Sequence, residues 1–373
     1  MPPSPRQYFL DNLRAFVIIL VIILHGSMTY MAFAPVWWYV VDAQTSLFFT
    51  ALVLLIDVPI MQVMFFVSGY FAMPSLRKRG ASGFLKNKTV HIGLPWVVGA
   101  LLLTPPVAYL TYYSRQVPMG LVEFWLSDFW TKLYQQSVYW YLGMLMVLFI
   151  VLTLVYSASR SLRQAEPVTR LPSWKALVGF LALMTAAFFA INLFFTIDTW
   201  TNSLVVIVFQ PLRLPLYFGY FFLGVYAYQR NWLTDGGYLP NLPGWALTCL
   251  FSGLIYLALR LSPQGSAPDA AAGVKALIDI AFNLFCLSTL LAALSFFKHK
   301  VNSAGRVWSS LAASSYGMYY FHPLILYPLT YIFLFVPLPL WLKAPTVIGL
   351  GILLSWGFTS QVIKRIPGLR EIF

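Results

Sequence analysis

The chain has 373 residues, of which 60% are hydrophobic and 9% are charged, and its formal net charge at pH 7 is +13. Soluble domains carry about 25% charged residues, so this composition excludes a soluble globular protein and predicts a polytopic membrane protein. Both cysteines fall inside apolar runs, so we expect neither a disulfide framework nor a metal site.

Apolar runs of about 20 residues predict an all-α bundle of about ten transmembrane helices, forming one membrane domain over residues 1–373. The runs are 13–33, 46–73, 91–113, 139–157, 175–195, 204–228, 243–260, 274–297, 311–335 and 344–363. The first run is long and no small-residue cleavage site follows it, so we expect a retained helix and not a signal peptide.

The distribution of basic residues predicts the orientation of the bundle. Most of the 24 Lys and Arg residues fall in alternate loops, on the same side as the N-terminus. The positive-inside rule therefore predicts that both termini are cytoplasmic. Topology explains the net positive charge, so we expect the lipid bilayer, and no nucleic acid, as a partner.

The first predicted helix carries Arg14 near the membrane surface and His25 close to the midplane. Asp11 and Asn12 are residue types that cap a helix N-terminus, so the helix is predicted to begin there. Arg14 and His25 are 11 residues apart. This spacing places them on one helix face, about 16 Å apart. An ionisable group at that depth indicates either a functional residue or a structural hydrogen bond to a neighbouring helix.

Other predicted helices carry ionisable residues to the same depth. They are Asp57, Arg213 and His322. Opposite charges at one depth need partners, so we expect these residues to share one polar chamber with His25. Prolines interrupt the helix near each of them, which fits a chamber lined by exposed carbonyls, although a plain packing kink is the alternative.

The first cytoplasmic loop is the most basic segment of the chain. Its basic residues are Arg77, Lys78, Arg79, Lys86, Lys88 and His91. Such clusters commonly fix topology or contact anionic lipid, and they also suit the phosphates of a cytosolic donor.

The second outer loop, residues 114–138, is rich in aromatic residues. Trp125 and Trp130, together with Phe124, Phe129 and Tyr134, stand at helical spacing among charged residues. This pattern predicts an amphipathic segment on the outer surface, either as an interfacial anchor or as a surface for a substrate.

Short motifs occur in a fixed order along nearly the whole chain. They are LDNLRA at 10–15 with His25, FVSGYF at 66–71, LP at 94–95, FFLG at 221–224, SYGMYYFHP at 315–323 and IPGL at 366–369. Together they resemble the motifs of the family-3 membrane acyltransferases, within them a branch that succinylates periplasmic glucans.

The resemblance implies a multi-pass enzyme of the bacterial inner membrane. It implies transfer of an acetyl or succinyl group, from a cytosolic acyl-CoA donor, to a hydroxyl of an extracytoplasmic glycan or lipid-linked sugar. Carried over to this sequence, His25 is the essential histidine and Arg14 its paired arginine. The basic motif of the family, often Arg-x-x-Arg, falls on Lys88 and His91, which lack the planar fork of arginine.

The same reading implies two entry routes. The phosphates of acyl-CoA would stay among the cytoplasmic cations while the pantetheine arm reaches the midplane. The acceptor would enter from the outer side, past Trp125, Trp130, Tyr139 and Trp140.

The expected chemistry centres on His25 as a neutral general base, with Asp57 or another acid orienting it. A transient acyl-histidine is the alternative. Arg213 or His322 would stabilise the oxyanion of the tetrahedral intermediate.

A transporter or flippase of a glycan or anionic substrate is the rival class, because the same midplane residues suit a proton relay. The chain lacks a detectable internal repeat, and this disfavours a transporter. The sequence leaves the acyl group, the acceptor and the oligomeric state open.

Overall fold

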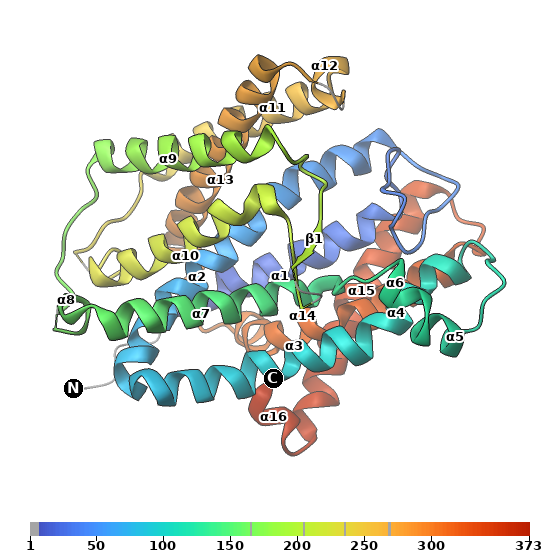
Figure 1. Ribbon diagram of the computed structural model, residues 1–373, viewed down its shortest axis with the longest axis horizontal. Coiled ribbons are helices and arrows are strands. Elements are labelled where there is room, and N and C mark those ends of the chain that lie inside the picture. Colours follow the sequence, from blue (N-terminus) through green and yellow to red (C-terminus); the bar gives the residue numbers. More distant parts are fainter. Residues whose placement is uncertain (1–6, 165, 204–205, 235, 268–269) are drawn as a thin grey trace.

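The computed structural model describes residues 7–373, with the exception of 165, 204–205, 235 and 268–269. Long helices lie side by side across most of the molecule (Figure 1). In the described residues, the only sheet is a hairpin of two short strands, β1 (Thr201–Ser203) and β2 (Ile207–Phe209). The structure therefore confirms an all-α bundle.

The helices differ widely in length. The long ones are α1 (Tyr8–Met28), α2 (Leu47–Lys88), α7 (Trp140–Ala158), α9 (Trp174–Asn192), α10 (Leu214–Gln229), α11 (Leu242–Leu261), α13 (Ala272–Lys300), α14 (Arg306–Phe333) and α15 (Leu340–Gln361). The short ones are α3 (Leu94–Val98), α4 (Thr104–Tyr113), α5 (Leu121–Leu126), α6 (Asp128–Thr131), α8 (Arg160–Gln164), α12 (Pro263–Ser266) and α16 (Leu369–Ile372). Single turns of π-helix, η1 (Thr89–Gly93) and η2 (Gly99–Leu103), and of 3-10 helix, η3 (Ser137–Tyr139), η4 (Pro211–Arg213) and η5 (Ile363–Arg365), connect some of them.

Seven helical segments in the described residues are long and apolar enough to cross a membrane. They are Tyr8–Met28, Leu47–Tyr113, Ser137–Ala158, Trp174–Asn192, Leu242–Leu261, Ala272–Lys300 and Leu340–Arg365. The segment Leu47–Tyr113 has 67 residues and contains two of the predicted spans. Within it, Gly80 has φ of 70° and leaves the helical conformation, so the two spans turn there.

The sixth predicted span, 204–228, differs most from the structure. Its first two residues lie outside the described residues, and β2 and the turn η4 stand where its first turns of helix are expected. The helix α10 begins only at Leu214, because Pro211 and Pro215 are tolerated in the first turn of a helix but not in its interior. Neither α10 nor α14 is among the seven segments. A total of ten spans and the orientation of the termini remain predictions.

Two glycines let α2 and α10 approach closely. A Cβ atom on Gly69 would overlap the carbonyl oxygen of Phe221, and a Cβ atom on Gly224 would overlap that of Phe66. These residues belong to the motifs at 66–71 and 221–224, so close helix packing explains why small residues stand there.

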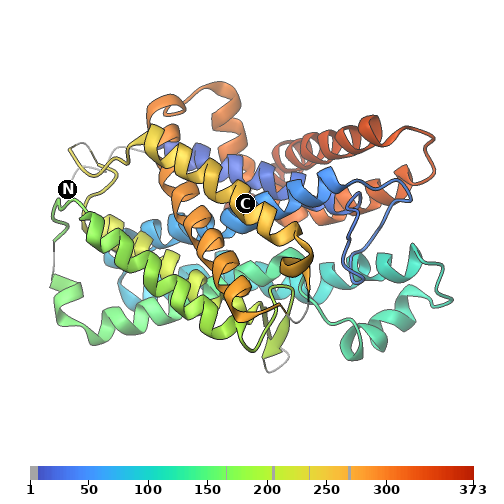
Figure 2. The same ribbon diagram turned by 90° about the horizontal axis from the view of Figure 1, so that it is seen from above.

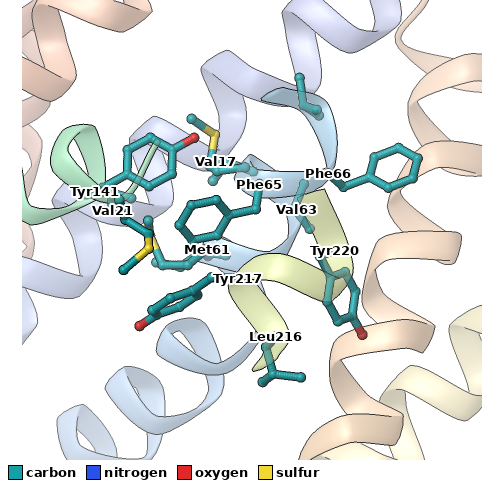
Figure 3. Packing of buried hydrophobic residues seen from close by; sticks show 14 of the residues in the cluster. Val17, Val21, Met61, Val63, Phe65, Phe66, Tyr141, Leu216, Tyr217 and Tyr220 are labelled. Atoms are coloured by element: carbon teal, nitrogen blue, oxygen red, sulfur yellow. The ribbon is translucent and has the colours of Figure 1, made fainter. Parts of the chain in front are cut away.

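The core around this crossing joins several helices (Figure 3). Val17 and Val21 reach it from α1, and Phe65 reaches it from α2. The ring of Phe65 lies 4.9 Å from that of Tyr141 on α7 and 4.8 Å from that of Tyr217 on α10. This packed layer joins α2 to α7 and α10.

The first helix and the C-terminal helices lie together, as the blue and red ribbons in Figure 2 show. Near the start of α1, the side-chain amide of Asn12 donates to the carbonyl oxygens of Val301 and Ser303, at 2.7 and 3.1 Å. Near its end, His25 contacts His322 on α14. The helices α1 and α14 therefore run in the same direction.

Candidate functional site

A partly open cavity of about 360 Å³ lies between α1, α2, α7 and α14. Its polar side chains are Arg14, Ser68, Lys88, His91, Tyr141, Ser315, Tyr316 and Tyr319. Apolar residues from the same helices, among them Ile18, Met64, Leu142 and Leu145, complete the wall. The cavity thus combines cationic groups with an apolar lining.

Arg14 is held at this cavity by its neighbours on α1 and α14. Its Nε donates to the hydroxyl of Ser315 at 3.3 Å, and its Nη2 lies 3.5 Å from a carboxylate oxygen of Asp11. The hydroxyl of Ser315 in turn donates to the carbonyl oxygen of Ala312. About two fifths of the Arg14 side chain is exposed (38%), so its planar fork of donors suits an anion in the cavity.

Lys88 and His91 reach the same cavity from the end of α2 and from η1. The ammonium of Lys88 lies 4.7 Å from the ring centre of Phe149, a distance typical of a cation–π contact. The Nδ1 of His91 donates to the carbonyl oxygen of Asn87 at 2.8 Å. The two positions onto which the basic motif of the family falls therefore lie beside Arg14.

The other basic residues of this segment lie outside the cavity wall. Lys78, Arg79 and Lys86 are exposed, and Arg77 is half-buried. Sequence reasoning did not single out Ser68, Tyr141 and Ser315, although Ser68 and Ser315 stand within the motifs at 66–71 and 315–323.

His25 lies beyond the inner end of the cavity. Ile18, which lines the cavity, is seven residues earlier on α1, or about 10 Å along the helix axis. The Nδ1 of His25 lies 3.0 Å from the Nε2 of His322, which is fully buried. The ring of Trp38 stacks on His25, with the ring centres 5.9 Å apart and the planes at 12°.

Asp57 and Arg213 form a separate ion pair between α2 and the start of α10. One terminal nitrogen of Arg213 binds the carboxylate of Asp57, and the other lies 3.3 Å from its backbone carbonyl. Arg213 is buried, and its guanidinium lies 5.6 Å from the ring centre of Phe282.

The midplane residues therefore form two pairs where the depth argument places one chamber. In the described part of the chain, no hydrogen bond joins the pair His25–His322 to the pair Asp57–Arg213. The ring of Phe65 lies between those of Tyr141 and Tyr217. Tyr141 lines the cavity, whereas Tyr217 stands on α10, four residues after Arg213. Each of these four residues binds one partner on a neighbouring segment of the bundle.

The loop over His25, between α1 and α2, is fixed by two basic residues that the sequence did not single out. Arg115 donates to the carbonyl oxygens of Val36 and Trp38, both at 2.9 Å. The Nζ of Lys343 lies 3.0 Å from the carboxylate of Asp42, and both side chains are buried. These contacts hold the loop in which Trp38 stacks on His25.

The aromatic segment predicted for the second outer loop forms short helices, α5 and α6. Trp125 is half-buried, and Trp130 stacks on Tyr134 with the ring centres 5.7 Å apart. A hydrogen bond from Lys132 holds the pKa of the Asp128 carboxyl below its usual range, and Tyr112 donates to the same carboxylate. Asp128 thus secures α6 against α4.

Tyr139 and Trp140 are packed against neighbouring segments of the bundle. Tyr139 is fully buried, and its hydroxyl donates to the carbonyl oxygen of Tyr320 at 3.0 Å. Trp140 packs on Trp200 and Tyr217, with ring centres 5.5 and 5.4 Å apart.

In the part of the chain that the structure covers, no group of three or more His, Cys, Asp or Glu side chains is arranged to hold a metal ion.

Residues 7–360 match the model of a protein family described as an acyltransferase domain. A stretch of 114 residues is 32% identical to glucans biosynthesis protein C of Salmonella paratyphi B, and equally to the proteins of that name from Salmonella heidelberg and Salmonella schwarzengrund. That stretch covers 31% of this chain and 29% of each relative. No solved structure matches the chain.

Proposed function

This chain belongs to the acyltransferase domain family, and from that premise we propose that it moves an acetyl or succinyl group from a cytosolic acyl-CoA to a hydroxyl of an extracytoplasmic glycan or lipid-linked sugar. As a member of the family it is a membrane-bound acyltransferase of groups other than aminoacyl groups. The donor, the acceptor, the residues and the placement in the bacterial inner membrane are the parts that we propose.

The observation that carries the donor site is the cavity of Arg14, Lys88 and His91. Phosphate groups are bound well by a guanidinium and by an ammonium, and the three residues line the same cavity. The pantetheine arm would lie along the apolar side chains of Ile18 and Met64. In this proposal, the nucleotide end of the donor lies beside Arg14, Lys88 and His91, and its thioester end lies in the interior of the bundle.

The acyl end must move past the inner wall of the cavity to reach His25. Tyr141 and Tyr319 line that end, and the hydroxyl of Tyr141 lies 2.9 Å from that of Ser68. Rotation of these side chains would extend the cavity along α1 by about 10 Å, the distance from Ile18 to His25. We propose that the entering pantetheine arm drives this rotation.

In the transfer step, His25 acts as general base. Its imidazole takes the proton from the acceptor hydroxyl, the hydroxyl oxygen bonds to the thioester carbonyl carbon, and the carbon–sulfur bond then breaks. The proton passes to the leaving thiolate, so the products are an ester and free coenzyme A. Asp57 and Arg213 neutralise one another outside this path.

The acceptor would approach from the outer side, where Trp38 covers His25 and Trp130 stands on the exposed segment. Aromatic faces suit the apolar faces of sugar rings. In this proposal, the loop that Arg115 and Lys343 hold defines the outer boundary of the site.

The test is His25→Ala in membranes supplied with acyl-CoA labelled in the acyl group. We expect label transfer to glycan or lipid to be lost at normal expression, whereas His299→Ala, a change near the end of α13 and outside the site, retains it. Retained transfer in His25→Ala would exclude His25 from the mechanism. Accumulation of unmodified glycan across the membrane, without labelled product, would instead support a transporter.

A further inference from the structure

The side chain of His322 is hydrogen-bonded to a backbone carbonyl that Pro323 leaves without its helical donor. In an α-helix, the carbonyl of residue 319 accepts a hydrogen bond from the backbone N–H of residue 323. Position 323 is a proline, which has no N–H, so the carbonyl of Tyr319 lacks its usual donor. The Nδ1 of His322 lies 2.7 Å from that oxygen and 3.2 Å from the carbonyl oxygen of Met318.

This hydrogen bond determines which nitrogen of His322 carries the proton. A carbonyl oxygen only accepts, so Nδ1 of His322 is the donor, and in the neutral ring Nε2 is then an acceptor. The Nε2 faces Nδ1 of His25 at 3.0 Å. His25 must therefore donate through Nδ1, which leaves the lone pair of its own Nε2 to act as the base.

We propose that His322 is a positioning residue that fixes the tautomer and orientation of His25, using the carbonyl of Tyr319 that Pro323 leaves without a helical donor. This inference rests on the proposed role of His25 and deepens it. In known triads, a third group orients the base in the same way, most often a carboxylate. Here an imidazole takes that place, and the stacked ring of Trp38 holds the face of His25.

Two amide substitutions separate positioning from packing. In His322→Gln, the side-chain oxygen can stand near the position of Nε2 and accept from His25. In His322→Asn, the shorter amide can stand near the position of Nδ1 and still donate to Tyr319, but it offers no acceptor to His25. Both variants keep a polar side chain of comparable size, so they differ in the contact to His25.

The measurement is kcat and donor KM with labelled acetyl-CoA and, separately, labelled succinyl-CoA, in membranes that hold the endogenous acceptor and equal amounts of each variant, with His25→Ala as reference. General-base catalysis contributes about 100-fold or more, so we expect kcat of His322→Asn to fall at least tenfold below that of His322→Gln. Donor KM stays unchanged in both, because His322 lies outside the cavity wall. If His25→Ala is inactive and the two His322 variants have equal kcat values, the inference is overturned. An active His25→Ala overturns the proposed function itself.

A second measurement needs no active variant. The chain has four histidines, so nitrogen-15 spectra of histidine-labelled protein, with His25→Ala for assignment, resolve the tautomer of each ring. We expect the proton of neutral His25 on Nδ1 and that of His322 on Nδ1 as well. A proton on Nε2 of His25 would overturn the inference.

Discussion

The Nε of Arg14 and the hydroxyl of Ser315 lie 3.3 Å apart, and this contact fixes the guanidinium at the wall of the cavity. A hydrogen bond from a charged guanidinium to a bound donor contributes about 1.5–3 kcal/mol, which corresponds to about 10- to 160-fold in affinity. We therefore expect Arg14→Gln to raise the donor KM by that factor. Arg170→Gln, at an exposed position, is the matched control and should leave KM unchanged. An unaltered KM in Arg14→Gln would remove Arg14 from donor binding.

Lys86 and Lys88 differ by two positions and offer a sharp comparison. Lys88 lines the cavity, whereas Lys86 is exposed outside it. If the cavity holds phosphate, Lys88→Gln raises the donor KM about tenfold, while Lys86→Gln leaves it within about twofold. Steady-state kinetics at varied donor concentration measures both. Similar effects of the two substitutions would show that the segment attracts the donor only through its overall charge.

The substitution Gly69→Ala tests the close approach of α2 and α10. A Cβ atom there would overlap a backbone carbonyl of α10, which cannot rotate away, so Gly69→Ala should lower the free energy of unfolding by about 1–3 kcal/mol or more. The control is Gly349→Ala on α15, where a Cβ atom would meet no atom within 4 Å. Alanine favours a helix by up to about 1 kcal/mol over glycine, so this control should be neutral or stabilising. Thermal unfolding in detergent compares them, and equal melting temperatures would contradict the packing argument.

The buried pair of Lys343 and Asp42 should be essential for the loop over His25. Removing one partner of a buried ion pair costs about 3–5 kcal/mol, because the other charge is left buried and unpaired. We expect Lys343→Met to cost about this much and to reduce acyl transfer, since the loop positions Trp38 over His25. The double change with Asp42→Asn should recover most of the lost stability.

The control for that experiment is the pair of Arg260 and Asp198, in which the aspartate is largely exposed. Exposed pairs contribute about 0–1 kcal/mol, so Arg260→Met should have a small effect on unfolding. If Lys343→Met and Arg260→Met destabilise the protein equally, the buried pair does not hold the loop in the way described.

The sequence predicted the class of fold, which the structure confirms, and it assigned one membrane depth to four ionisable residues without giving their lateral neighbours. Hydropathy and helical rise give a position along the membrane normal, and by this measure His25, Asp57, Arg213 and His322 are alike. Which of them meet depends on the direction that each helix face points, and this is decided by packing such as that of Gly69 against α10. The pairing of His25 with His322 therefore became visible only in three dimensions.

The apolar run at 204–228 shows a second limit. Its composition is that of a membrane span, yet proline at 211 and 215 fixes the helix start at Leu214. Hydropathy records how apolar a segment is, whereas backbone geometry decides where its hydrogen bonds are made. The loop contacts of Arg115 and Lys343 left no pattern in the sequence, because their partners are distant along the chain.

The segment Leu47–Tyr113 is helical throughout except at the turn of Gly80, so Lys88 and His91 stand on a stiff support and not on a loose connection. An incoming nucleotide would meet these cations already in place, with little entropy lost in ordering them. An enzyme of this construction should choose among donors chiefly by the fit of the nucleotide head, and tolerate variation in the group that it carries.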